Sequence, residues 1–130
     1  MPRILLIDDD ALLRRMLRLT LESLGHTVDE AADGDEGLAR FGAEPPDLVL
    51  TDLIMPGKEG METIIELRRD YPDVKVIAMS GGRSGVIEFL KAARLLGAAA
   101  ILQKPFTTEV LAAAIATALA PPAAGGDPAP

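Results

Sequence analysis

The chain of 130 residues contains no cysteine and no tryptophan, and aromatic residues make up only 3% of it. The lack of cysteine excludes disulfides and thiolate metal sites, which is compatible with a reducing compartment. Basic residues are also in the minority, because 13 Lys and Arg face 20 Asp and Glu and leave a net charge of −7. Binding to nucleic-acid backbones depends on clustered Lys and Arg, so we expect no direct contact with nucleic acid.

Long hydrophobic runs are missing as well. The N-terminal run, Ile4 to Ile7, has four residues before three aspartates, which is too short for the apolar region of a signal peptide. The weakly polar stretch 110–124 contains Thr117 and two prolines, and it falls short of the ~20 apolar residues that a membrane span needs. We therefore expect a cytoplasmic protein of one domain that does not enter the membrane.

Short apolar segments alternate along the chain with segments that have helical spacing. The spacing predicts strands at 4–7, 27–31, 48–51, 74–79 and 99–102, and helices that begin near residues 11, 34, 60, 84 and 107. Such alternation is typical of a doubly wound parallel sheet with right-handed crossovers. The apolar stripes place Met16, Met61 and Met79 in the core, and Ile65 and Val110 among the other inward-facing residues. The domain is expected to cover residues 1–119, and the Pro/Ala/Gly-rich stretch 120–130 to form a flexible tail or linker.

Polar residues follow four of the expected strands: Asp8 and Asp9, then Asp52, Ser80 and Lys104. Ligands of parallel sheets bind beyond the carboxyl ends of the strands, so these side chains are expected at one edge. Carboxylates that lie close together need a cation to remain ionised, and an all-oxygen set suits Mg²⁺. Asp52 stands alone at its strand end and is the candidate nucleophile for forming an aspartyl phosphate. The ammonium of Lys104 and the hydroxyl of Ser80 would stabilise the transferred phosphoryl group.

These residues, together with the short motifs around them, resemble the receiver domain of response regulators, the CheY-like module of two-component signalling. The matching residues are Asp8-Asp9, Asp52 with Met55-Pro56 and Gly60, Ser80, and Lys104-Pro105-Phe106. The resemblance implies a flavodoxin-like α/β fold, with a five-stranded parallel sheet of order 2-1-3-4-5 and five helices.

The resemblance also implies a function. A sensor histidine kinase or a histidine phosphotransfer protein would phosphorylate Asp52, with Mg²⁺ held by Asp9, Asp52 and the main-chain carbonyl of Ile54, and by Asp8 mainly through water. The Lys104-Pro105 bond would be cis. Phosphorylation would shift the face made by the fourth helix, fifth strand and fifth helix, and so control a downstream effector, from a monomer or a weak homodimer. Such a switch takes and slowly loses its own phosphoryl group but is not an enzyme in the usual sense.

Two features depart from the family pattern. Ile101 stands three positions before the lysine, where the family often has an aromatic residue that reports the switch. The loop after Ser80 is rich in glycine, with Gly81 and Gly82 first, and we predict that it becomes ordered on phosphorylation.

Three other functions fit parts of the pattern. A Mg²⁺-dependent phosphohydrolase that works through an aspartyl phosphate would carry a second acid two residues after the nucleophile, where this chain has Ile54. A carrier of flavin mononucleotide would need a hydroxyl- and glycine-rich loop where the chain has three aspartates. A receiver-like module that works without phosphorylation is disfavoured by the complete set of site residues.

Overall fold

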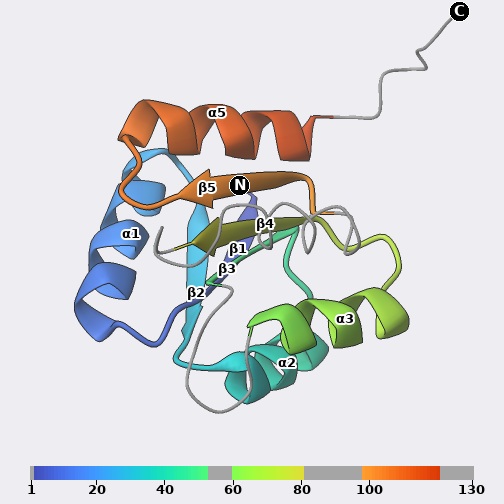
Figure 1. Cartoon of the computed structure of the whole chain (residues 1–130). Coiled ribbons are helices and arrows are strands. Elements are labelled where there is room, and N and C mark those ends of the chain that lie inside the picture. Colours follow the sequence, from blue (N-terminus) through green and yellow to red (C-terminus); the bar gives the residue numbers. More distant parts are fainter. Residues whose placement is uncertain (1, 53–59, 81–97, 121–130) are drawn as a thin grey trace, which may run out of the picture.

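The computed structural model describes residues 2–52, 60–80 and 98–120 (Figure 1). Strands and helices alternate along most of this length. Their bounds are β1 Arg3–Ile7, α1 Ala11–Ser23, β2 Thr27–Ala31, α2 Gly34–Ala43, β3 Leu48–Asp52, α3 Gly60–Asp70, β4 Val76–Ser80, β5 Ala100–Gln103 and α5 Thr108–Leu119. The expected helix after residue 84 lies outside the described residues, as does all but the first residue of the expected tail, 120–130.

The five strands form one parallel sheet in the order β2-β1-β3-β4-β5, which confirms the predicted topology. The chain moves outward from β1 to β2, returns to β3 on the other side of β1, and continues to β4 and β5. The strand order therefore reverses between β1 and β3, and ligands bind at this point in sheets of this class. Among the described residues, no helix is long and apolar enough to cross a membrane.

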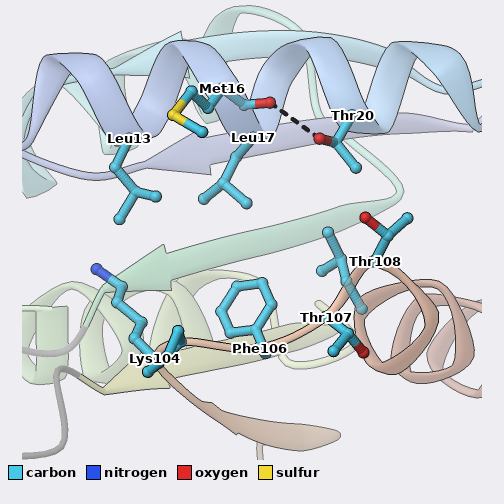
Figure 2. Close-up of a pocket in the computed structure, with 10 residues that line it drawn as sticks. Leu13, Met16, Leu17, Thr20, Lys104, Phe106, Thr107 and Thr108 are labelled. Carbon is cyan, nitrogen blue, oxygen red and sulfur yellow. Dashed lines mark hydrogen bonds between the residues drawn. The ribbon is translucent and has the colours of Figure 1, made fainter.

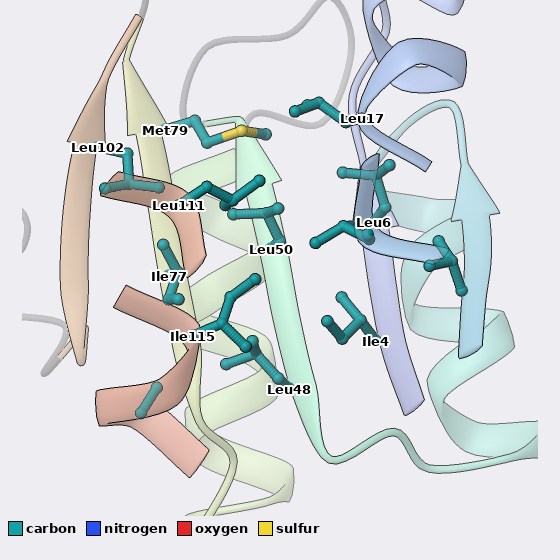
Figure 3. Close-up of a cluster of buried hydrophobic side chains, with 13 residues drawn as sticks. Ile4, Leu6, Leu17, Leu48, Leu50, Ile77, Met79, Leu102, Leu111 and Ile115 are labelled. Carbon is teal, nitrogen blue, oxygen red and sulfur yellow. The ribbon is translucent and has the colours of Figure 1, made fainter. Parts of the chain in front are cut away.

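Helices cover the sheet on both faces, α1 and α5 on one and α2 and α3 on the other (Figure 1). Successive side chains of a strand point to opposite faces, so Ile4 and Leu6 pack under α1 and α5, while Leu5 and Ile7 pack under α2 and α3. Figure 3 shows the first of these two cores. Burial on both faces explains why the strands appear in the sequence as unbroken apolar runs.

Side-chain caps fix the starts of three helices. Asp10 accepts hydrogen bonds from the amides of Leu12 and Leu13, each at 3.1 Å, at the start of α1. Asp33 caps α2 in the same way, and Thr107 accepts from the amide of Val110 at 3.1 Å at the start of α5. These bonds satisfy amides that have no partner within the helix. The cap on α1 also fixes where the acidic loop after β1 ends.

Three of the residues that their spacing assigned to the core lie at the surface. Met79 is fully buried, as predicted, but Met16 is 58% exposed, Ile65 50% and Val110 47%, so the prediction for these three was wrong. Ile65 and Val110 are each next to a fully buried residue, which lies about 100° away around the helix. Met16 borders an open groove. A spacing of three or four identifies the buried side of a helix but not the width of the buried stripe.

Candidate functional site

Three carboxylates meet at the carboxyl edge of the sheet, beside the point where the strand order reverses. Asp8 directly follows β1 and Asp52 ends the neighbouring strand β3, so parallel pairing brings them together. One carboxylate oxygen each from Asp8, Asp9 and Asp52 lies within 4.8 Å of the others. Asp8 is fully buried, Asp52 is 8% exposed and Asp9 is exposed. The structure thus brings together the three acids that the sequence pointed to.

Lys104 provides the positive charge of this cluster. Its Nζ donates to Oδ2 of Asp52 at 2.9 Å and to Oδ2 of Asp8 at 3.1 Å. The main-chain amide of Lys104 donates to the carbonyl of Ser80 at 2.7 Å, which fixes the residue beside the end of β4. The Lys104-Pro105 peptide bond is cis, in agreement with the expectation from the resemblance.

The protonation of Lys104 follows from these contacts. Burial is the largest single influence, and on its own it favours the neutral amine and lowers the pKa. The hydrogen bond and negative charge of Asp52, joined by those of Asp8, together outweigh burial and raise the pKa of Lys104 above its ordinary value. Lys104 is therefore an ammonium at neutral pH, and the formal charges of the three acidic side chains and this one ammonium sum to −2.

Asp8 is held at several points. Its Oδ1 accepts from the amide of Asp10 at 2.9 Å, and its Oδ2 accepts from Lys104. Its own amide donates to the carbonyl of Ala31 in β2 at 3.1 Å. A buried carboxylate requires such partners, because an unpaired buried charge is very costly. The loop after β1 is therefore anchored to β2, to α1 and to the end of β5.

Of the other predicted site residues, the structure describes Ser80 and Ile101. Ser80 is the last residue of β4, 7% exposed, and thus lies at the same edge of the sheet. Ile101 is half-buried in the edge strand β5, where it pairs with Ala78. Ile54, Gly81 and Gly82 lie outside the described residues. Their proposed parts in metal binding and switching stay predictions.

Sequence reasoning missed Arg14, whose side chain contacts the acidic loop. Its Nη1 donates to the carbonyl of Asp8 at 2.7 Å, and its Nε pairs with Oε1 of Glu30 in β2 at 2.8 Å. A signal was present, because Arg14 is four residues after the cap Asp10, and helical side chains lean toward the N-terminus and onto the preceding loop.

A groove runs from Lys104 along α1. It lies between that helix and the segment from Lys104 to Leu111, and Figure 2 shows Leu13 and Leu17 pointing across it toward Lys104 and Phe106. Its walls are mostly apolar. Next to it, α1 presents three exposed apolar side chains at helical spacing, Leu12, Met16 and Leu19, at 71%, 58% and 60% exposure.

The donor set of the cluster suits one kind of chemistry. Carboxylate oxygens without histidine or cysteine favour a hard divalent cation, and the net negative charge would attract one. A carboxylate next to a cation and an ammonium is also able to attack an electrophilic phosphorus whose oxygens those charges neutralise. A parallel α/β fold with three acids and a lysine at the carboxyl edge of its sheet has the groups that binding a divalent cation and handling a phosphoryl group require.

Comparison with known proteins names the family. The family model described as "Response regulator receiver domain" matches residues 4–116. The chain therefore belongs to the response regulator receiver domains of two-component signalling.

Curated relatives agree with this assignment. The probable C4-dicarboxylate response regulator DctR of Halalkalibacterium halodurans is 36% identical over 115 residues, which cover 87% of this chain and 49% of the relative. Response regulator MprA of Mycobacterium ulcerans is 37% identical over 111 residues, covering 85% of this chain and 47% of the relative. The chain thus spans about half the length of these relatives.

Solved structures share the fold. A CheY-like receiver domain protein from Methanospirillum hungatei superposes with a TM-score of 0.85 at 31% identity, covering 92% of this chain and 94% of that one. The response regulator TrrA of Thermotoga maritima, solved in complex with Mg(2+)-BeF, gives a TM-score of 0.82 at 29% identity and covers 92% of this chain and 100% of that one.

Proposed function

We propose that this chain is a phosphorylation-dependent switch in which Asp52 accepts a phosphoryl group from a histidine kinase or a histidine phosphotransfer protein. One observation carries the proposal. The ammonium of Lys104 lies 2.9 Å from the carboxylate of Asp52 inside an acidic cluster at the switch point of the sheet. Membership of the receiver family supports the same reading.

The transfer uses groups of this chain at each stage. An oxygen of Asp52 attacks the phosphorus of the phosphohistidine, the new P–O bond forms as the P–N bond breaks, and the electron pair leaves with the imidazole. Lys104 stays protonated and pairs with the phosphoryl oxygens in place of the Asp52 carboxylate. Ser80 donates its hydroxyl hydrogen bond to another of these oxygens. The extra negative charge is thereby neutralised inside the site.

The residues present fit Mg²⁺, because the site offers carboxylate oxygens of Asp8, Asp9 and Asp52 close together. The main-chain carbonyl of Ile54 would complete the protein ligands. When bound, the ion neutralises the phosphoryl oxygens and offsets the repulsion between the incoming group and the acids. The complex of the relative TrrA with Mg(2+)-BeF supports this assignment.

The groove along α1 is the proposed docking place of the phosphohistidine partner. The donor must bring its phosphorus to Asp52, and the groove begins at Lys104, which contacts that residue. An apolar groove beside exposed Leu12, Met16 and Leu19 fits a partner helix that lays its apolar side against α1. With such a partner purified, Met16→Glu should slow transfer from phosphohistidine but leave labelling by acetyl phosphate unchanged. The matched control is Leu24→Glu, because Leu24 is an exposed apolar residue just past the C-terminal end of α1 and does not line the groove.

The output is proposed to act on another protein. Phosphorylation would shift the face that includes β5 and α5, and the helix expected before β5, toward a form that an effector recognises. The chain would act in the cytoplasm as a monomer or a weak homodimer, and as a switch more than as an enzyme. The relatives called transcriptional regulators are about twice as long as this chain, so no DNA contact is assigned to it.

Labelling with a small phosphodonor tests the proposal. Wild type, Asp52→Asn and Asp47→Asn are incubated with Mg²⁺ and acetyl phosphate and compared by intact mass. Asp47 is an exposed aspartate just before the same strand, at its opposite end, and serves as the matched control. We expect one phosphoryl group on wild type and on Asp47→Asn, and none on Asp52→Asn. Equal incorporation in Asp52→Asn and wild type would overturn the assignment.

A further inference from the structure

We propose that Arg14 is a positioning residue of the site, which sets the direction of the Asp8-Asp9 peptide and thereby holds Asp9 where it binds Mg²⁺. The inference rests on the proposed function, because it assumes that the acidic cluster binds that ion. It assigns to Arg14 and Glu30 a part in metal binding although neither would touch the metal.

The contacts of Asp8 carry the first step. Both main-chain groups of this residue are bound from outside its loop: its amide donates to Ala31 at 3.1 Å, and its carbonyl accepts from Arg14 at 2.7 Å. The carbonyl of Asp8 lies in the same rigid plane as the amide of Asp9. Holding that carbonyl therefore fixes the orientation of the peptide plane that joins Asp8 to Asp9. Asp9 is exposed and contributes to the acidic cluster from that plane.

The fixation of Arg14 carries the second step. The side chain of Arg14 is only 17% exposed, and Glu30 in β2 pairs with its Nε at 2.8 Å. The other oxygen of Glu30 accepts from Arg18, also at 2.8 Å. A planar guanidinium held at two edges has little freedom to rotate, so its Nη1 is aimed at the loop. Through this ion pair and the hydrogen bond of Arg14 to Asp8, the loop that carries Asp8 and Asp9 is held in a fixed position relative to β2.

The chain offers a matched control in Arg18. It pairs with the same carboxylate at the same distance and sits one turn further along α1, but its hydrogen bonds go to Glu30 and Glu22 and not to the loop. Arg18→Met removes an ion pair to Glu30, as Arg14→Met does. Arg14→Met also removes the hydrogen bond to Asp8. The difference between the two variants isolates that bond.

The experiment measures Mg²⁺ affinity by calorimetry, amide exchange of residues 8–10, and the rate of labelling by acetyl phosphate as a function of Mg²⁺. We expect Arg14→Met to weaken Mg²⁺ binding about tenfold, as loss of a residue that orients a metal ligand does. Amide exchange in the loop should quicken. The labelling rate at saturating Mg²⁺ should stay within about twofold of wild type, because the reacting groups remain. Arg14→Lys keeps the charge without the fork and should restore affinity only in part.

Each outcome decides between the alternatives. Mg²⁺ affinity lowered by Arg14→Met but not by Arg18→Met supports the inference, even if both variants lose thermal stability. Equal Mg²⁺ affinities in the two variants would show that Arg14 is only a structural residue, and the proposed function would survive. Unchanged Mg²⁺ affinity in Asp9→Asn would remove Asp9 from the metal site and overturn this inference alone. Wild type that binds no Mg²⁺ would overturn the metal site of the proposed function and this inference with it.

Discussion

Nζ of Lys104 lies 2.9 Å from Oδ2 of Asp52, although Asp52 ends β3 and Lys104 follows β5, and these two strands are not neighbours. β4 separates β3 from β5, and adjacent strands are about 4.8 Å apart, so the contact bridges about 10 Å of sheet. A short side chain cannot reach across that distance, whereas the four-carbon stem of lysine can. The side chain of Lys104 therefore passes over the end of β4, where Ser80 lies, and places its ammonium beside Asp52.

The first prediction concerns this ammonium. Lys104→Met should slow phosphorylation of Asp52 by at least about 100-fold, which is the usual cost of removing one preorganised partner of a developing charge. Mg²⁺ should bind more tightly to the variant, because a competing positive charge has gone from the acidic cluster. Intact mass after acetyl phosphate gives the rate, and calorimetry gives the affinity.

Lys75→Met is the control for this variant. Lys75 directly precedes β4, so it lies at the opposite edge of the sheet, and its replacement removes the same charge from the chain. Its labelling rate and Mg²⁺ affinity should equal those of wild type. Weaker Mg²⁺ binding by Lys104→Met would count against our account of the cluster's electrostatics.

The order of the elements made much of this site predictable from sequence. In a parallel sheet all strands end at one edge, so Asp8, Asp52 and Lys104 converge whatever the details of packing. The part played by Arg14 was not predictable in the same way, because it depends on the direction of one side chain and on its partner in β2. The exposure of Met16 was missed for a related reason: periodicity does not reveal that a groove stays open beside the helix.

The second prediction separates two adjacent aspartates. Asp9 belongs to the acidic cluster, whereas Asp10 caps α1. Asp9→Asn should stabilise the metal-free protein slightly, by up to about 1 kcal/mol, because it relieves repulsion among three acids. Added Mg²⁺ should then raise its Tm much less than that of wild type, because the variant binds the ion more weakly.

Asp10→Asn removes the same charge one residue later and keeps a good capping side chain. Its Tm should therefore respond to Mg²⁺ as wild type does. Thermal unfolding with and without Mg²⁺ measures both variants. A normal Mg²⁺ response in Asp9→Asn would remove Asp9 from the metal site.

The third prediction is a pH dependence of stability. The hydrogen bond from Arg18, helped by the bond and charge of Arg14, outweighs partial burial and lowers the pKa of Glu30. A carboxyl group whose pKa is lower in the folded protein than in the unfolded chain stabilises the fold at pH values above its ordinary pKa. This stabilisation is lost as the pH falls through the pKa of the folded state. Glu30→Gln should lower the free energy of unfolding by about 1 kcal/mol at pH 7. The difference in free energy of unfolding between this variant and wild type should become smaller below pH ~4.

Urea unfolding at several pH values measures this gap. Glu22→Gln is the control, because Glu22 forms one exposed pair with Arg18 and should contribute about 0.3 to 0.5 kcal/mol. A gap for Glu30→Gln that is the same at pH 7 and at pH ~3 would contradict the assignment of the stabilisation to ionised Glu30.

The last prediction concerns the contact between α2 and the strand that leads into the acidic loop. Gly37 lies so close to Ile7 that a Cβ at this position would overlap the end of the isoleucine side chain. Gly37→Ala should therefore destabilise the protein by about 1 to 3 kcal/mol, despite the better helix propensity of alanine. Gly42→Ala in the same helix would meet only the Tyr71 hydroxyl at 3.8 Å and should stabilise by about 0.5 to 1 kcal/mol.

A double-mutant cycle identifies the atom responsible. Ile7→Val removes the Cδ1 that the new methyl group would overlap, so Gly37→Ala should cost less in that background than in wild type. Chemical denaturation of the four proteins gives the coupling energy. Because Ile7 directly precedes Asp8, Gly37→Ala should also weaken Mg²⁺ binding, and Ile7→Val should recover part of that loss. Independent effects of the two substitutions would mean that α2 yields to the added methyl group without moving β1.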